Sequence, residues 1–126
     1  RTVVYKTGYH IVWSTKYRRQ VLTGDVASGL KDILYAIACD KDFIIKEVEI
    51  MPDHVHVFAS AHPKVPAGYI YKMLKGISAR KLFVKFPEIT KKLWQGKLWN
   101  PSTYVETIGH ISEKTVRKYI QDQKEK

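Results

Sequence analysis

The chain has 126 residues and a formal net charge of +10. Its length is typical of one domain spanning 1–126, and 44% hydrophobic residues can form a core without disulfides or a structural metal. The single cysteine, Cys39, cannot form an internal disulfide, which predicts a reducing, cytoplasmic location. No apolar run is long enough to cross a bilayer and no signal-peptide pattern opens the chain, so we expect neither a membrane-spanning nor a secreted protein.

The positive charge is concentrated in the second half of the chain. Residues 1–63 contain eight Lys and Arg residues against seven Asp and Glu residues, whereas residues 64–126 contain fourteen against five. A field of this sign favours a polyanionic partner. Nucleic acid is the first candidate and an anionic membrane surface is the second. A basic protein with neither partner is the remaining alternative.

Two periodicities in the apolar residues predict the elements of secondary structure. Apolar residues three and four apart indicate helices, and alternation of apolar with polar residues, which we assign to Phe43 to Ile50, indicates a half-buried strand. Pro52 and Pro87 remove backbone donors and should end the elements before them. In chain order we predict a strand over 3–14, a polar loop over 15–20, a helix over 24–40, strands over 43–50 and 54–60, a helix over 67–85, a short helical turn over 88–94, a strand over 98–107 and a helix over 112–123.

This order of elements predicts an α+β fold. The first six elements follow the βαββαβ pattern of a ferredoxin-like sandwich, and a C-terminal helix follows them. Two helices should cover one face of a four-stranded, mostly antiparallel sheet. The helix over 67–85 should turn its apolar face to that sheet; the face comprises Ile70, Met73, Leu74, Ile77 and Val84. The other face of the sheet would be open to a ligand, a partner subunit or the last helix.

The His54-Val55-His56 segment is the principal candidate for chemistry. Alternate residues of a strand point to the same side, so both imidazoles should face one cation while Val55 and Val57 point into the core. Imidazole is a common metal ligand, and two imidazoles aligned by one strand are preorganised. Two histidines at this spacing are nevertheless more often surface or core residues than ligands. A metal site needs at least one further ligand.

The predicted last helix offers that further ligand. Tyr119 and Gln123 are four residues apart, so they lie one turn apart on the same helix face. The side-chain carbonyl oxygen of Gln123 is a hard ligand that suits Mg²⁺ or Mn²⁺. Tyr119 would then lie beside the same metal ion. The alternative is that Tyr119 packs against the protein with its hydroxyl in solvent.

Four segments of the chain resemble the IS200/IS605-family transposases in order. These are the string from Tyr9 to Arg19, the His54 and His56 motif with its lead-in from Met51, the string from Trp99 to Tyr104, and the string from Arg117 to Gln123. The resemblance covers nearly the whole chain. The REP-associated tyrosine transposases are similar as well, because they share the histidine pair and the tyrosine.

The resemblance implies a metal-dependent DNA transposase that acts on single strands. His54, His56 and Gln123 would bind Mg²⁺ or Mn²⁺, and the Tyr119 oxygen would attack the scissile phosphate to give a 5′-phosphotyrosine link and a free 3′-OH. The DNA partner would have hairpin ends. Members of the family are homodimers in which the tyrosine helix reaches the partner's metal site, and Gly109 could serve as the hinge for such an exchange. No small-molecule or membrane partner is expected.

Basic and aromatic side chains complete the predicted DNA-binding set. Lys16, Arg18, Arg19, Lys72, Lys75 and Arg80 are the candidates for phosphate contacts, and Tyr17, Tyr69 and Tyr71 are the candidates for stacking on bases. Two other readings remain open from the sequence. One is a non-catalytic nucleic-acid-binding module of the same fold, similar in outline to an RNA recognition motif. The other is a structural or regulatory homodimer with a vestigial metal site.

Overall fold

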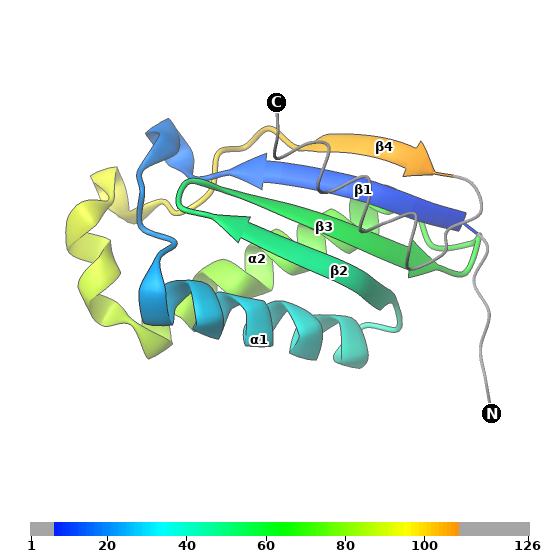
Figure 1. The fold of residues 1–126 in the computed structure, drawn as a ribbon, viewed down its shortest axis with the longest axis horizontal. Coiled ribbons are helices and arrows are strands. Elements are labelled where there is room, and N and C mark those ends of the chain that lie inside the picture. The colour runs from blue at the N-terminus through cyan, green and yellow to red at the C-terminus, as the bar shows by residue number, and fades with distance from the viewer. Residues whose placement is uncertain (1–6, 109–126) are drawn as a thin grey trace.

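The computed structural model describes residues 7–108 (Figure 1). The predicted helix over 112–123 and the first residues of the strand over 3–14 lie outside this range. No helix within 7–108 is both long enough and apolar enough to cross a membrane. The elements in chain order are β1 (Thr7–Ser14), η1 (Lys16–Arg18), α1 (Gly24–Asp40), β2 (Ile44–Met51), β3 (His54–Ala61), α2 (Ala67–Lys85), η2 (Pro87–Lys92), η3 (Trp94–Gly96) and β4 (Tyr104–Ile108).

The four strands form one sheet in the order β2-β3-β1-β4, and every neighbouring pair is antiparallel. Helices α1 and α2 lie side by side on one face of this sheet (Figure 1). The α+β, ferredoxin-like architecture predicted from the sequence is therefore confirmed for the described residues. Strands β2 and β3 form the predicted hairpin, because Met51 pairs with His54 and only two residues, Pro52 and Asp53, turn the chain between them.

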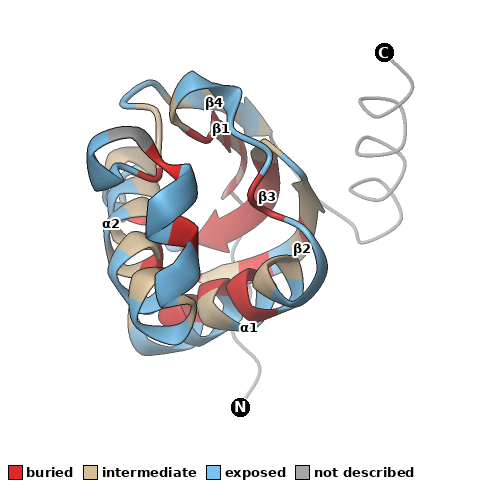
Figure 2. Cartoon of the chain, turned by 90° about the vertical axis from the view of Figure 1, so that its left-hand side faces the viewer, coloured by how far each residue is buried: buried red, intermediate tan, exposed pale blue. Residues whose placement is uncertain are grey.

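The core lies between the sheet and the two helices (Figure 2). On β1, Ile11 and Trp13 are 0% and 2% exposed, and they lie opposite Val57 and Val55 of β3. Residues that pair directly across antiparallel strands share a face, so these four side chains all point toward the helices. The residues between them on each strand point to the other face of the sheet, which we call the open face.

A β-bulge in β2 resolves a mismatch in its apolar spacing. Ile45 and Val48 are three residues apart, so they cannot share one face of a regular strand. The pairing shifts between Ile45 and Glu47, which leaves Lys46 without a direct partner on β3. Both apolar side chains are consequently buried, at 8% and 2% exposed.

The buried face of α2 differs from the prediction at one end. Ile70 and Leu74 are fully buried as expected, and Leu82 continues the same face. Val84, which we placed on that face, is 81% exposed, so this part of the prediction is wrong. The buried residues of α2 follow steps of four, and each step advances about 40° around the helix, so by the last turn the buried side has moved away from Val84.

The fourth strand is shorter than predicted and begins later. The strand expected over 98–107 is regular only from Tyr104 to Ile108. The preceding segment approaches the end of β1 through single contacts: Thr15 bridges Trp99, and the Asn100 amide donates to the carbonyl of Ser14 at 2.9 Å. Pro101 has no amide hydrogen, so a continuous ladder cannot form there.

The closest approach of α1 to the end of α2 depends on Gly29. A Cβ atom at this position would lie 2.7 Å from the Phe86 ring, whereas a Cβ atom at Gly76 of α2 would meet nothing within 4 Å. We predict that Gly29→Ala lowers the free energy of unfolding by about 1–2 kcal/mol because the ring must shift. Gly76→Ala should raise it by up to about 1 kcal/mol. Urea unfolding of both variants measures this, and equal stabilisation by the two would contradict the packing described.

Candidate metal centre and its surroundings

His54 and His56 lie on the open face of the sheet, as the strand spacing predicts. Val55 lies between the two histidines and Val57 follows His56. Both valines are fully buried in the core that α1 and α2 cover. The two imidazole rings have centroids 5.1 Å apart and are inclined at 70°. His56 is 9% exposed, and His54 is partly exposed at the hairpin end of β3. The site is therefore a partly buried pair of imidazoles held by a rigid strand.

The Asp53 carboxylate holds the ring of His54. The Nδ1 atom of His54 lies 2.6 Å from Oδ1 of Asp53, and the guanidinium of Arg18 lies 3.7 Å from the other carboxylate oxygen. The hydrogen bond to His54, helped by the charge of Arg18, holds the pKa of Asp53 below its usual value. A carboxylate at Nδ1 orients the ring and makes Nε2 the nitrogen that carries a lone pair.

His56 has a different neighbour, the buried side chain of His10 on β1. Nδ1 of His56 lies 3.1 Å from Nε2 of His10, and Nδ1 of His10 lies 3.8 Å from a carboxylate oxygen of Glu106 on β4. Burial lowers the pKa of His10, and the nearby Glu106 carboxylate opposes this shift only in part. His10 had no assigned role in the sequence. Its position follows only once β1 is known to lie between β3 and β4.

A tight basic loop joins β1 to α1 beside the His54 end of β3. The buried Thr15 hydroxyl donates to the carbonyl of Arg19 at 2.8 Å, and the Thr15 amide donates to the carbonyl of Asp53 at 2.9 Å. Tyr17 and Arg18 both have a positive φ, 59° and 55°, a conformation that is uncommon for residues other than glycine. The loop thus begins against Asp53 and places the Arg18 guanidinium beside the carboxylate that holds His54, with the Tyr17 ring 59% exposed.

Lys75, one of the predicted phosphate contacts, is engaged inside the protein. Its ammonium group donates to the carbonyl of Asn100 at 2.7 Å and to the hydroxyl of Thr103 at 2.9 Å, and it lies 3.3–3.4 Å from two further carbonyls of the same segment. The Trp99 indole donates to the Lys75 carbonyl at 3.1 Å. Burial lowers the pKa of the Lys75 amine. Lys75 therefore anchors the segment that leads into β4.

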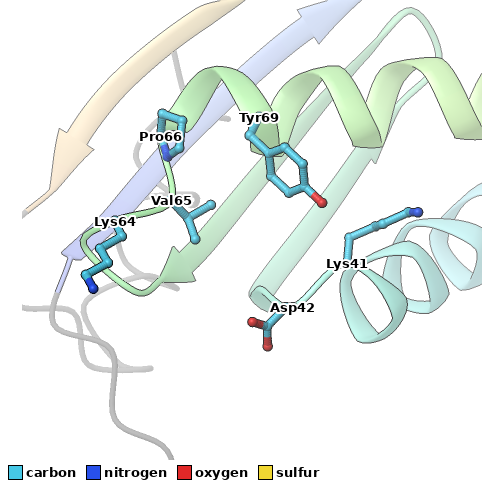
Figure 3. A pocket seen from close by; sticks show the side chains of 6 residues that line it. All are labelled: Lys41, Asp42, Lys64, Val65, Pro66 and Tyr69. Atoms are coloured by element: carbon cyan, nitrogen blue, oxygen red, sulfur yellow. The ribbon is translucent and has the colours of Figure 1, made fainter.

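The other predicted contacts on α2 lie away from the histidine pair. Lys72, Arg80 and Tyr71 belong to the helix that packs on the opposite face of the sheet. Tyr69, at the start of α2, borders a hollow of about 260 Å³ that Lys41, Asp42 and residues 64–66 also line (Figure 3). This hollow lies beyond the far end of β3 from His54. The structure brings Arg18 to the carboxylate beside His54, with Lys16 and Arg19 flanking it in the same loop, and does not bring the α2 residues there.

Tyr119 and Gln123 lie outside the described residues. Within 7–108, no group of three or more His, Cys, Asp and Glu side chains could hold a metal ion. The histidine pair could supply two imidazole ligands, and a complete metal site needs at least one more.

Comparison with known proteins identifies the family. The family model described as "Transposase IS200 like" matches residues 3–123. The chain belongs to the IS200-like transposases. It is similar to the ISDra2 transposase TnpA of Deinococcus radiodurans, with 46% identity over 126 residues that cover 100% of this chain and 90% of the relative. It is 32% identical to the transposase for insertion sequence element IS200 of Salmonella typhimurium, over 93% of this chain and 76% of the relative.

Solved structures agree with this assignment. A crystal structure of a Deinococcus radiodurans R1 protein superposes on this IS200-like transposase with a TM-score of 0.79 at 44% identity, covering 98% of this chain and 95% of that one. A REP-associated tyrosine transposase, solved bound to a REP hairpin, gives a TM-score of 0.62 at 16% identity, with 95% and 66% covered. The second match supports the fold alone. The resemblance seen in the sequence is confirmed, and the chain is a transposase.

Replacing Lys75 in this IS200-like transposase tests its anchoring role. We predict that Lys75→Met lowers the free energy of unfolding by about 1–3 kcal/mol, because partly buried carbonyl groups lose their charged donor. Lys72→Met, one turn away and exposed, should change it by less than about 0.5 kcal/mol. Urea unfolding at neutral pH measures both. If the two variants were equally stable, Lys75 would have no structural task and its place among the phosphate contacts would be restored.

Proposed function

We propose that this transposase cuts and rejoins single-stranded DNA, with a divalent metal ion held by His54, His56 and Gln123 and with Tyr119 as the nucleophile. The observation that carries the proposal is the arrangement of the two histidines on the open face. Each ring has its Nδ1 atom engaged, one by Asp53 and the other by His10, so we take Nε2 as the metal-binding nitrogen of each ring. Membership of a transposase family supplies the reaction class.

The residues present fit Mg²⁺ or Mn²⁺. Two imidazoles that share one ion at bond lengths of about 2.1 Å have ring centres about 5 Å apart, and the observed separation is 5.1 Å. A carboxylate lies behind His54, as is usual for histidine ligands. The amide oxygen of Gln123 would complete a mixed nitrogen and oxygen set that leaves positions for phosphate oxygens. When bound, such an ion supplies Lewis-acid polarisation of the scissile phosphate.

The proposed reaction conserves the energy of the phosphodiester bond. The Tyr119 oxygen forms a bond to the phosphorus, and the bond from phosphorus to the 3′ oxygen breaks. The phenol loses its proton, and the leaving oxygen gains one to become a 3′-OH. The 5′ phosphate remains on Tyr119 until another 3′-OH attacks it, which restores the phenol. Because each step exchanges one phosphodiester for another, rejoining requires no ATP.

A folded single strand is the proposed DNA partner. The net charge of +10 favours a polyanion, and a relative of the same fold is known bound to a REP hairpin. We propose that Lys16, Arg18 and Arg19 contact phosphates near the cleavage point and that Tyr17 stacks on a base. These side chains project from the loop beside His54. Single-stranded substrate suits this loop, because an unpaired base exposes its face to an aromatic ring without unstacking of a duplex.

Covalent trapping tests the nucleophile. The protein is mixed with labelled single-stranded DNA from the ends of its own element and with Mg²⁺ or Mn²⁺. We predict a denaturant-resistant protein–DNA adduct that is lost in Tyr119→Phe and in the presence of a chelator. Tyr35→Phe, which removes a hydroxyl from the exposed side of α1, is the matched control and should retain the adduct. An adduct that persists in Tyr119→Phe would rule out this tyrosine.

Two further outcomes of the trapping experiment separate the alternatives. Tight binding of the same DNA without metal and without any adduct would favour a non-catalytic binding module. Mixing Tyr119→Phe chains with His54→Ala chains tests the proposed homodimer with a shared site. Recovery of adduct in the mixture, when neither variant forms it alone, would place the tyrosine of one subunit at the metal of the other. No recovery would place both in the same subunit.

The salt dependence of binding tests the basic loop. We predict that Lys16→Ala with Arg19→Ala reduces the slope of log affinity against log salt by about 0.7 for each lost phosphate contact. The control, Lys31→Ala with Lys46→Ala, removes the same charge from α1 and β2 and should leave the slope within about 0.3 of the wild type. Filter binding to a single-stranded oligonucleotide at several salt concentrations gives the slopes. Equal slopes for the two double variants would exclude the loop from the interface.

A further inference from the structure

A buried chain of polar side chains runs across three strands behind His56. It begins at Nδ1 of His56 on β3, passes through His10 on β1 and ends at the carboxylate of Glu106 on β4. The ring of His10 is 1% exposed, although it belongs to the open face rather than to the core under the helices. A buried imidazole in this position costs free energy unless both of its nitrogen atoms have suitable neighbours.

We propose that His10 and Glu106 are positioning residues that set the tautomer and the ring orientation of His56 for metal binding. This inference rests on the proposed function, since it takes His56 to be a ligand. It assigns a task to two residues that are not ligands themselves. The tautomer and orientation of His54 need no intermediate residue, because the Asp53 carboxylate contacts its Nδ1 atom directly.

The order of donors and acceptors along the chain carries the argument. The Glu106 carboxylate only accepts, so it favours a proton on Nδ1 of His10, 3.8 Å away. A neutral imidazole has one donor and one acceptor, so Nε2 of His10 then accepts. Its partner at 3.1 Å, Nδ1 of His56, must donate. The lone pair of His56 is thereby placed on Nε2, the form that a metal ion requires.

The opposite order of donors would disable the ligand. If Nε2 of His10 carried the proton, it would donate to Nδ1 of His56, and the hydrogen of His56 would lie on Nε2. That nitrogen could not bind a cation without first losing its proton. Glu106 therefore selects one of two arrangements that the pair of histidines could otherwise adopt. Glu106 acts on His56 only by fixing which nitrogen of His10 carries the hydrogen, and no group changes its charge.

Aromatic contacts hold the His10 ring in one orientation. His10 lies nearly parallel to Phe58, with centroids 4.6 Å apart and an angle of 13° between the planes. The rings of His10 and Tyr104 meet at an angle of 74° with their centroids 6.1 Å apart. The Tyr104 hydroxyl lies 3.3 Å from the carboxylate of Glu106. Phe58 is fully buried. A ring held in this way cannot rotate to exchange its two nitrogen atoms at low cost.

Two substitutions of His10 separate its packing from its hydrogen bonding. His10→Phe keeps an aromatic ring against Phe58 and removes the acceptor, whereas His10→Gln replaces Nε2 with an amide oxygen that can accept from His56. We expect His10→Phe to weaken Mn²⁺ binding 10-fold to 100-fold, as is typical when the partner of a ligating histidine is lost. His10→Gln should restore the affinity to within about 3-fold of the wild type.

Ser78→Ala is the control for loss of a buried hydrogen bond. Ser78 belongs to α2 and is fully buried, and its hydroxyl accepts from Trp99 on the opposite side of the sheet from His56. This variant should be less stable than the wild type and should bind Mn²⁺ equally well. Affinity is measured by electron paramagnetic resonance titration of Mn²⁺ into the full chain. If His10→Phe bound Mn²⁺ as tightly as the wild type, the inference would be overturned.

The tautomer of His56 is measured in the same chain without metal. Long-range ¹H–¹⁵N correlation spectra of ¹⁵N-labelled protein distinguish a proton on Nδ1 from one on Nε2. We expect the Nδ1–H form for His56 in the wild type and loss of that preference in Glu106→Leu. The Nε2–H form in the wild type would overturn the inference, even if His10→Phe failed to fold. If the wild type showed the Nδ1–H form but bound no Mn²⁺, the proposed metal site would be wrong. The assignment of the His56 tautomer to His10 and Glu106 would still hold.

Discussion

The register between β3 and its neighbours is the constraint on which the rest of the structure depends. Val55 and Val57 face the helices only because they pair with Trp13 and Ile11 of β1, and the same pairing turns His54 and His56 to the open face. A slip of one residue would bury the imidazoles under α1 and α2 and expose the valines. Fully buried valines make that slip costly, so the hydrophobic core fixes the direction of the two imidazole side chains.

The open face imposes a second requirement, because it is polar yet partly closed. His10 and His56 are 1% and 9% exposed, so their nitrogen atoms need partners within the protein. The hairpin turn gives His54 a carboxylate from the preceding residue, whereas His56, two residues further along, is linked to a carboxylate two strands away. The two imidazoles therefore depend on different parts of the fold. Changes in β4 should affect His56 and leave His54 in place.

Much of this arrangement was predictable from local patterns. The bounds of α1 and α2 followed from apolar spacing, and the common face of His54 and His56 followed from alternation along one strand. The position of His10 behind His56 was not predicted, because it requires the strand order and the exact pairing of residues 46 positions apart. The bulge between Ile45 and Glu47 was missed for a similar reason, because it depends on the pairing of β2 with β3. The late start of β4 had a local signal in Pro101, but the path of that segment also depends on its contacts with Lys75.

The basic residues show the limit of composition as a guide to function. Lys16 and Lys75 looked equivalent in the sequence as candidates for phosphate contacts. In the structure one projects from a strained loop beside His54 and the other holds the carbonyl groups of the segment before β4. A count of positive charges favours a polyanionic partner but cannot separate these two tasks. Hydrogen-bond partners separate them directly.

The central claim is that one divalent ion binds between His54 and His56 on the open face. The most direct measurement is the anomalous difference map of crystals of the full chain soaked in Mn²⁺. A single strong peak within bonding distance of Nε2 of both imidazoles would agree with the account. A peak bound instead to the Nδ1 atoms, or to the carboxylates of Glu47 and Glu49 on β2 with none between the histidines, would contradict it.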